Sequence, residues 1–167
     1  MPPPIKITGG DDVTLQSLVS GNKEVLEDYR CGGCQRLKTC TKIDSMSAAP
    51  KVLVISLSRF DSSTGWLRKD QTKVSYSEYL ELPVEHSEGA NPAAAGGGGQ
   101  QYELISVVKH RGGTINSGHY VAVCRHPNTG RWNEYNDAII TEDVVCPANK
   151  SCSEACIFIY GPVREQE

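Results

Sequence analysis

This sequence of 167 residues is poor in aromatic side chains and has neither an excess of basic charge nor a long hydrophobic run. Its 38% hydrophobic content includes only two Phe and two Trp, which still suffices for the core of a single domain. The net charge of −3, without a basic stripe, predicts no nucleic-acid partner. No stretch approaches the roughly 18 apolar residues of a membrane span, and no signal peptide is visible. We therefore expect an intracellular protein, of the cytoplasm or the nucleus, without a membrane partner.

The seven cysteines do not form the even set of a disulfide framework, so reduced thiols or metal ligands fit them better. Cys31 and Cys34 enclose two glycines, which favours a tight knuckle. Such a pair is typical of half of a four-cysteine zinc site, of a redox pair, or of no site, and no second CxxC follows. Cys156 lies in an apolar run and is expected to be a buried strand residue.

The chain pattern predicts an α+β fold that is mostly antiparallel sheet with few helices. Residues 1–12 predict an irregular lead-in, residues 13–21 one short helix, and residues 164–167 a tail. Residues 87–101 are rich in Ala and Gly and predict a flexible surface insertion. Strands are expected within 50–60, 102–111, 119–126, 131–140 and 154–162, and a loop and hairpin over 64–84. The helices that would cover one side of such a sheet are missing, so the chain resembles one half of a domain.

His119 is the strongest candidate for a catalytic group. It follows Gly118 at the start of an alternating strand, and Pro127-Asn128-Thr129-Gly130 predicts a turn after that strand. If the strands on either side of this turn pair antiparallel, Asn136 or Asp137 comes to lie beside the imidazole. A histidine with such a partner is typical of a general base, although a hydrogen-bonded histidine at a strand edge remains an equal alternative.

His110 is the competing candidate, but it has no following partner at hairpin spacing and is expected to be structural. The other two histidines fall in turn or linker sequence and carry no functional signal.

Several stretches together resemble the catalytic domain of the ubiquitin-specific proteases, the papain-like deubiquitinating cysteine proteases. They are "YRCGGC", "APKVLVISLSRF", "YELISVVKHRGGTINSGHYVAVCRH", "RWNEYND" and "CIFIYGP". The resemblance implies a partial catalytic domain over residues 13–163, with the antiparallel palm, part of the fingers and no helical thumb. It also implies ubiquitin and ubiquitinated proteins as partners.

The same resemblance implies roles for single residues. His119 matches the catalytic histidine, Asn136 the third member of the triad and Asp137 the assisting acid. Cys31 and Cys34 match the second of two zinc knuckles, which makes them half of a possible structural zinc site. No cofactor is implied for the chemistry itself.

The family's nucleophile comes from a box resembling G-N-x-C followed by an aromatic residue, and no such box is present. Gly21-Asn22 is followed by Lys23-Glu24. We therefore expect the C-terminal half of a thiol-dependent deubiquitinase, inactive in isolation, whose partner would be the missing N-terminal half. The alternative is a non-catalytic ubiquitin-binding or scaffold module.

Overall fold

A computed structural model describes residues 4–8, 10, 13–21, 23–43, 48–61, 68–83, 99–114 and 117–163. In this part of the chain, one short helix, α1 (Leu15–Val19), accompanies a series of strands. The strands are β1 (Ile5–Lys6), β2 (Val13–Thr14), β3 (Lys23–Arg30), β4 (Leu37–Ile43), β5 (Leu53–Ser58), β6 (Phe60–Asp61), β7 (Arg68–Lys69), β8 (Val74–Tyr76), β9 (Tyr79–Leu82), β10 (Gln100–Thr114), β11 (Ser117–Arg125), β12 (Trp132–Asn136), β13 (Ile139–Val144), β14 (Lys150–Cys152) and β15 (Ala155–Pro162). No helix among these residues is long and apolar enough to cross a membrane.

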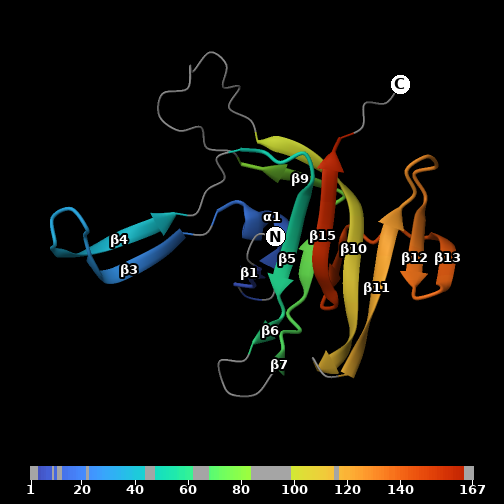
Figure 1. Cartoon of the computed structure of the whole chain (residues 1–167), viewed down its shortest axis with the longest axis horizontal. Coiled ribbons are helices and arrows are strands. Elements are labelled where there is room, and N and C mark those ends of the chain that lie inside the picture. Colours follow the sequence, from blue (N-terminus) through green and yellow to red (C-terminus); the bar gives the residue numbers. More distant parts are fainter. Residues whose placement is uncertain are drawn as a thin grey trace, which may run out of the picture.

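The main sheet has the order β1-β5-β15-β10-β11-β12-β13, and β9 also pairs with β10 (Figure 1). All pairings in it are antiparallel except that of β1 with β5. The 15-residue β10 is the central strand of this sheet, because β9, β11 and β15 all pair with it. The largely antiparallel sheet with few helices confirms the predicted fold class.

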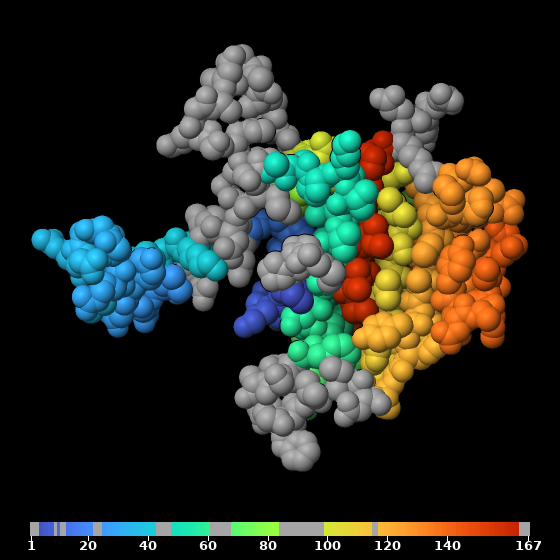
Figure 2. All heavy atoms as spheres, viewed as in Figure 1, coloured from blue at the N-terminus to red at the C-terminus, as the bar shows by residue number. Residues whose placement is uncertain are grey.

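A small sheet of order β14-β8-β2, together with α1, packs against the main sheet. The helix begins at Thr14, whose side chain accepts a hydrogen bond from the backbone N–H of Ser17. The shared core is formed by residues from both layers, including Leu15, Val74, Leu104 and Phe158, each fully buried. The β3–β4 ribbon projects away from this body (Figure 2).

The chain departs from the sequence prediction at four places, one of which is the turn at 137–138 that divides the strand predicted over 131–140 into β12 and β13. Within the lead-in predicted as irregular, Ile5–Lys6 forms β1 and pairs parallel with the end of β5. Strand β10 begins at Gln100, inside the segment predicted as a flexible insertion. The hairpin expected over 64–84 is wrong, because β8 pairs with β14 and β9 with β10. Val84, residues 87–98 and the predicted tail 164–167 lie outside the described residues.

The failed hairpin has a physical reason. Val74 and Tyr76 of β8 and Leu80 and Leu82 of β9 are buried in the core between the two sheets, whereas Tyr79 is exposed. The link at Ser77 and Glu78 carries the chain from the small sheet to the large one, so that both strands can bury these side chains. The Tyr160 hydroxyl donates to the Ser77 carbonyl at 2.8 Å, and the Leu104 N–H donates to the Glu78 carbonyl at 2.7 Å.

Arg59, directly after β5, is almost completely buried. Its guanidinium donates hydrogen bonds to four backbone carbonyl oxygens, those of Ala155 (2.6 Å), Thr72 (2.8 Å), Asp70 (3.1 Å) and Cys152 (3.1 Å). These carbonyls belong to the segment between β7 and β8 and to the β14–β15 turn. One cation therefore joins three separate parts of the chain beneath the main sheet.

Replacing Arg59 with Met is expected to lower the free energy of unfolding by about 3 kcal/mol or more, because several carbonyl groups lose their donor. Urea denaturation measures this loss. The matched control is Arg131→Met, since Arg131 is mostly exposed and its guanidinium, among the described residues, pairs with the exposed Asp143 at 2.9 Å. That change is expected to cost less than about 1 kcal/mol. Equal losses in the two variants would contradict the role assigned to Arg59.

His110 on β10 is 2% exposed, as expected for a structural histidine. Its ring lies against Phe60, with centroids 5.3 Å apart, and against Tyr120 at 4.8 Å. Its Nδ1 atom has no hydrogen-bond partner among the described residues. Burial, and then the charge of Lys69, lower the pKa of His110. The ring is therefore neutral in the folded chain near pH 7.

The lowered pKa makes the stability of the fold depend on pH. Below the unfolded pKa of about 6.5, the unfolded chain takes up a proton that the folded chain refuses until its own lower pKa is reached. Acidification through this window is expected to destabilise the fold by up to about 1.4 kcal/mol per pH unit. The variant His110→Asn should lose this contribution in urea titrations. Above about pH 7.5 its pH profile should run parallel to that of the wild type, and an unchanged slope at lower pH would contradict the assignment.

Candidate active site

The β11–β12 hairpin builds the candidate site. The turn at 127–129 is closed by two backbone hydrogen bonds, from His126 N to Arg131 O at 2.7 Å and from Gly130 N to His126 O at 2.9 Å. From Arg125↔Trp132 the strands pair without a register shift as far as Ala122↔Tyr135. The hairpin predicted from the turn sequence is therefore confirmed.

This register brings His119 and Asn136 together. The His119 Nε2 atom lies 2.6 Å from the Asn136 Oδ1 atom. An amide oxygen only accepts, so Nε2 carries the hydrogen, and Nδ1 of the neutral ring carries the lone pair. Nδ1 makes no hydrogen bond with the described residues, and 44% of the His119 side chain is exposed. Asn136 thus holds the ring at Nε2, while Nδ1 has no hydrogen-bond partner among the described residues.

Asp137 is the second neighbour of His119. Its Oδ2 atom lies 3.6 Å from Nε2, beyond a direct hydrogen bond, and its side chain is 79% exposed. The residue sits in the two-residue turn between β12 and β13 with φ of 52°, a conformation that Asp tolerates better than most residues. Asn136 is therefore the principal partner, and water screens the charge of Asp137.

An ion pair that sequence reasoning missed lies next to these residues. Arg111 is directly opposite His119 in the β10–β11 ladder, and its Nη2 atom is 2.8 Å from Glu134 Oε2. Glu134 precedes Asn136 by two positions on β12, so both side chains point to the same face. The sequence signal was hidden because Arg111 begins a Gly-rich stretch that reads as a turn.

None of the seven cysteines, all of which lie in described residues, is hydrogen bonded to His119. Cys124 follows on the same strand, but its Sγ atom contacts Ser106 Oγ at 3.1 Å. Cys156 is buried in β15, as predicted, and its Sγ donates to the Val108 carbonyl at 3.3 Å. The described residues therefore provide an imidazole and an amide partner but no thiol hydrogen bonded to the imidazole.

Cys31 and Cys34 lie in the turn at the tip of the β3–β4 ribbon. The turn is closed by a hydrogen bond from Gln35 N to Cys31 O at 2.8 Å. The backbone N–H groups of Cys34 and Gly33 lower the pKa of the Cys31 thiol, which favours the thiolate that binds metal. The donor set fits two of the four ligands of a structural zinc site. Among the described residues, no group of three or more potential metal ligands is found.

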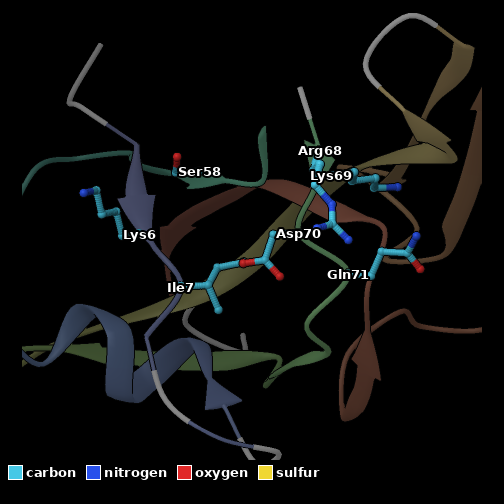
Figure 3. A pocket seen from close by; sticks show the side chains of 7 residues that line it. All are labelled: Lys6, Ile7, Ser58, Arg68, Lys69, Asp70 and Gln71. Carbon is cyan, nitrogen blue, oxygen red and sulfur yellow. The ribbon is translucent and has the colours of Figure 1, made fainter. Parts of the chain in front are cut away.

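A pocket of about 720 Å³ lies elsewhere, between β1, the end of β5 and β7 (Figure 3). Its lining residues are Lys6, Ile7, Ser58, Arg68, Lys69, Asp70 and Gln71. None of the residues around His119 contributes to it. The candidate catalytic groups therefore lie on an open face of the hairpin and not in this pocket.

The sequence of this chain is similar to those of known ubiquitin carboxyl-terminal hydrolases. The model of the family described as ubiquitin carboxyl-terminal hydrolase matches residues 14–160. The chain is 35% identical over 163 residues to human ubiquitin carboxyl-terminal hydrolase 2, covering 94% of this chain and 25% of that protein. It is 35% identical over 136 residues to Usp2 of Drosophila melanogaster, covering 78% of this chain and 13% of that protein.

Among solved structures, the yeast SAGA DUBm with an Sgf73 mutant has a TM-score of 0.75 at 25% identity. The SAGA Ubp8/Sgf11/Sus1/Sgf73 DUB module bound to ubiquitin aldehyde has a TM-score of 0.71 at 27% identity. These matches cover 98% and 96% of this chain and 35% of each solved chain. The chain thus spans about a third of the solved chains and a quarter or less of these curated relatives. The family model and the shared fold establish that the chain belongs to the ubiquitin carboxyl-terminal hydrolase family, as a partial catalytic domain of the ubiquitin-specific protease type.

Proposed function

We propose that this chain supplies the acid–base part of a deubiquitinase active site, with His119 as general base, Asn136 as its orienting partner and Asp137 as an assisting acid. The observation that carries the proposal is the 2.6 Å contact between His119 Nε2 and Asn136 Oδ1. It fixes the tautomer and the direction of the ring while Nδ1 remains open. An imidazole prepared in this way can accept a proton near neutral pH and return it later.

The nucleophile of this proposal is a cysteine from outside residues 1–167, either in another segment or in another chain. Nδ1 of His119 takes the proton of that thiol, and the thiolate attacks the carbonyl carbon of the terminal glycine of ubiquitin. The resulting oxyanion is held by donors from the same outside segment. His119 gives its proton to the departing lysine amine, and a thioester remains. Water, deprotonated by His119, hydrolyses the thioester and restores the free thiol.

The substrates in this proposal are ubiquitinated proteins inside the cell. One relative of known structure is bound to ubiquitin aldehyde and another is described as bound to monoubiquitin, which supports ubiquitin as the ligand. The chemistry requires no cofactor. Cys31 and Cys34 provide half of a zinc site whose role is to hold the tip of the β3–β4 ribbon.

A non-catalytic role is the second candidate, and the lack of any cysteine hydrogen bonded to His119 favours it. In that case the chain would bind ubiquitin or act as a scaffold without hydrolysing anything. The two functions differ in whether His119 matters once a nucleophile is supplied.

A chimera tests this difference. The chain replaces the matching segment of human ubiquitin carboxyl-terminal hydrolase 2, and release of a fluorescent group from the ubiquitin C-terminus is measured. The chain alone is expected to be inactive and the chimera active. In the chimera, His119→Ala should lower kcat by about a thousandfold or more, because the base is lost. Asn136→Ala should lower kcat by a smaller factor, about tenfold or more, because the ring loses its orientation.

The matched control is Asn133→Ala on the other face of β12, which should leave kcat within about twofold. Hydrolysis by the chimera that survives His119→Ala would exclude His119 as the base. A folded chimera that binds ubiquitin with wild-type affinity and hydrolyses nothing would favour the non-catalytic role.

A further inference from the structure

We propose that Lys69 of β7 is a positioning residue for His119, and this inference rests on the proposed role of His119. Lys69 does not touch the imidazole. Its Nζ atom donates to the carbonyl oxygens of His110 at 2.6 Å and of Gly112 at 2.7 Å. Both carbonyls belong to the end of β10, in the segment that pairs with the start of β11.

The β10–β11 ladder is interrupted at this point. Its register runs to Arg111↔His119, shifts, and resumes only at Thr114↔Ser117. The backbone around Gly112 therefore lacks the regular cross-strand pairing that fixes the rest of the hairpin. The ammonium of Lys69 donates to the carbonyls on either side of Arg111, at the edge of β10 that faces β15, and the pairing of β10 with β15 ends just before them at Lys109↔Ala155. Lys69 therefore replaces the strand partner that this end of β10 lacks.

Gly118, the residue before His119, is closely packed against the segment that Lys69 binds. Gly112 has φ of +137°, and a Cβ atom there would lie 2.5 Å from Ser117 O and 2.7 Å from Gly118 Cα. A Cβ atom on Gly118 would lie 2.1 Å from His110 Nε2. Gly118 thus rests on the His110 ring on one side and on Gly112 on the other. A shift of either carbonyl that Lys69 holds displaces Gly118, and His119 follows directly.

The backbone around Lys69 is fixed by contacts with β6 and with Arg59. Phe60 pairs with Lys69 in the β6–β7 ribbon, and the N–H of Asp70 donates to the Arg59 carbonyl at 2.6 Å. Arg59 in turn binds the Asp70 and Thr72 carbonyls. The half-buried Lys69 therefore extends from a fixed base toward the end of β10, which is the arrangement that a positioning contact requires.

Lys69 also lines the pocket of Figure 3, where Lys6 and Arg68 contribute further positive charge. A role as an anion ligand fits the hydrogen bonds less well. Two of the three ammonium donors are used by carbonyl oxygens, at distances typical of strong charge-assisted bonds. The geometry therefore favours support of the β10–β11 backbone over ligand binding.

NMR spectroscopy of the imidazole nitrogens in the whole chain tests the proposal. Asn136→Ala gives the spectrum of a His119 ring without its partner. In Lys69→Met, the His119 Nε2 signal is expected to move from its wild-type position toward that of Asn136→Ala. Lys69→Arg, which keeps a cation able to donate to both carbonyls, should return the signal toward the wild-type position. The signals of His126, which directly follows the far end of β11, should stay in place in every variant.

The matched control is Lys73→Met, because Lys73 is an exposed lysine of the same loop without a hydrogen bond to the described residues. A Lys69→Met chain that is folded, with unmoved His126 signals and an unmoved His119 signal, would overturn the proposal. If Lys69→Met does not fold, the wild-type chain decides. The Lys69 ammonium should then give a slowly exchanging signal with hydrogen-bond couplings to two carbonyl carbons, and the lack of such couplings would overturn the proposal. These signals report on geometry and not on turnover, so the result stands whether or not the chimera hydrolyses ubiquitin.

Discussion

The register of the β11–β12 hairpin is the constraint on which the candidate site depends. Side chains alternate between the two faces of a strand, so a slip of one residue would turn either His119 or Asn136 to the opposite face. The turn at 127–129 and the pairing that starts at Arg125↔Trp132 exclude that slip. Val121 and Val123, on the same face as His119, are buried in the core, so a slipped register would also expose apolar side chains. The packing free energy of the core therefore maintains the 2.6 Å contact between His119 and Asn136.

Two cations bind backbone carbonyls at the end of the main sheet where β15 begins and its pairing with β10 stops. Arg59 binds carbonyls of the β14–β15 turn and of the segment after β7, and Lys69 binds carbonyls at the end of β10. Each cation donates to backbone carbonyls at or near the ends of strands, and leaving the buried ones without a donor would cost about 1–3 kcal/mol each. The two cations lie on neighbouring elements joined by the Asp70 N–H to Arg59 carbonyl bond. Hydrogen bonds of Arg59 and Lys69 thus connect the β14–β15 turn and the β6–β7 ribbon to the end of β10, which pairs with the start of β11.

The sequence predicted the parts of this structure that depend on local patterns. The central strands β5, β10, β11, β12 and β15 of the main sheet, the turn before Trp132 and the proximity of His119 to Asn136 follow from alternation and turn chemistry. It did not predict the separation of β8 from β9 or the parallel pairing of β1, because the partners of these strands are distant in sequence. The structural roles of Arg59 and Lys69 were not predicted for the same reason. A single Arg or Lys reads as a surface residue, and nothing in its neighbours reveals a carbonyl that lies 96 or 41 positions away.

The geometry also limits what a nucleophile must bring to complete the site. His119 is already held in one tautomer by Asn136, and its open Nδ1 faces away from that partner. A general base with a fixed ring requires only that the thiol approach one nitrogen, so orientation is provided before the second group arrives. The exposed Asp137 adds little to this orientation, since water screens a carboxylate that is 79% exposed. The hairpin therefore holds the His119 imidazole in one orientation before any second group arrives, although no thiol of this chain is hydrogen bonded to His119.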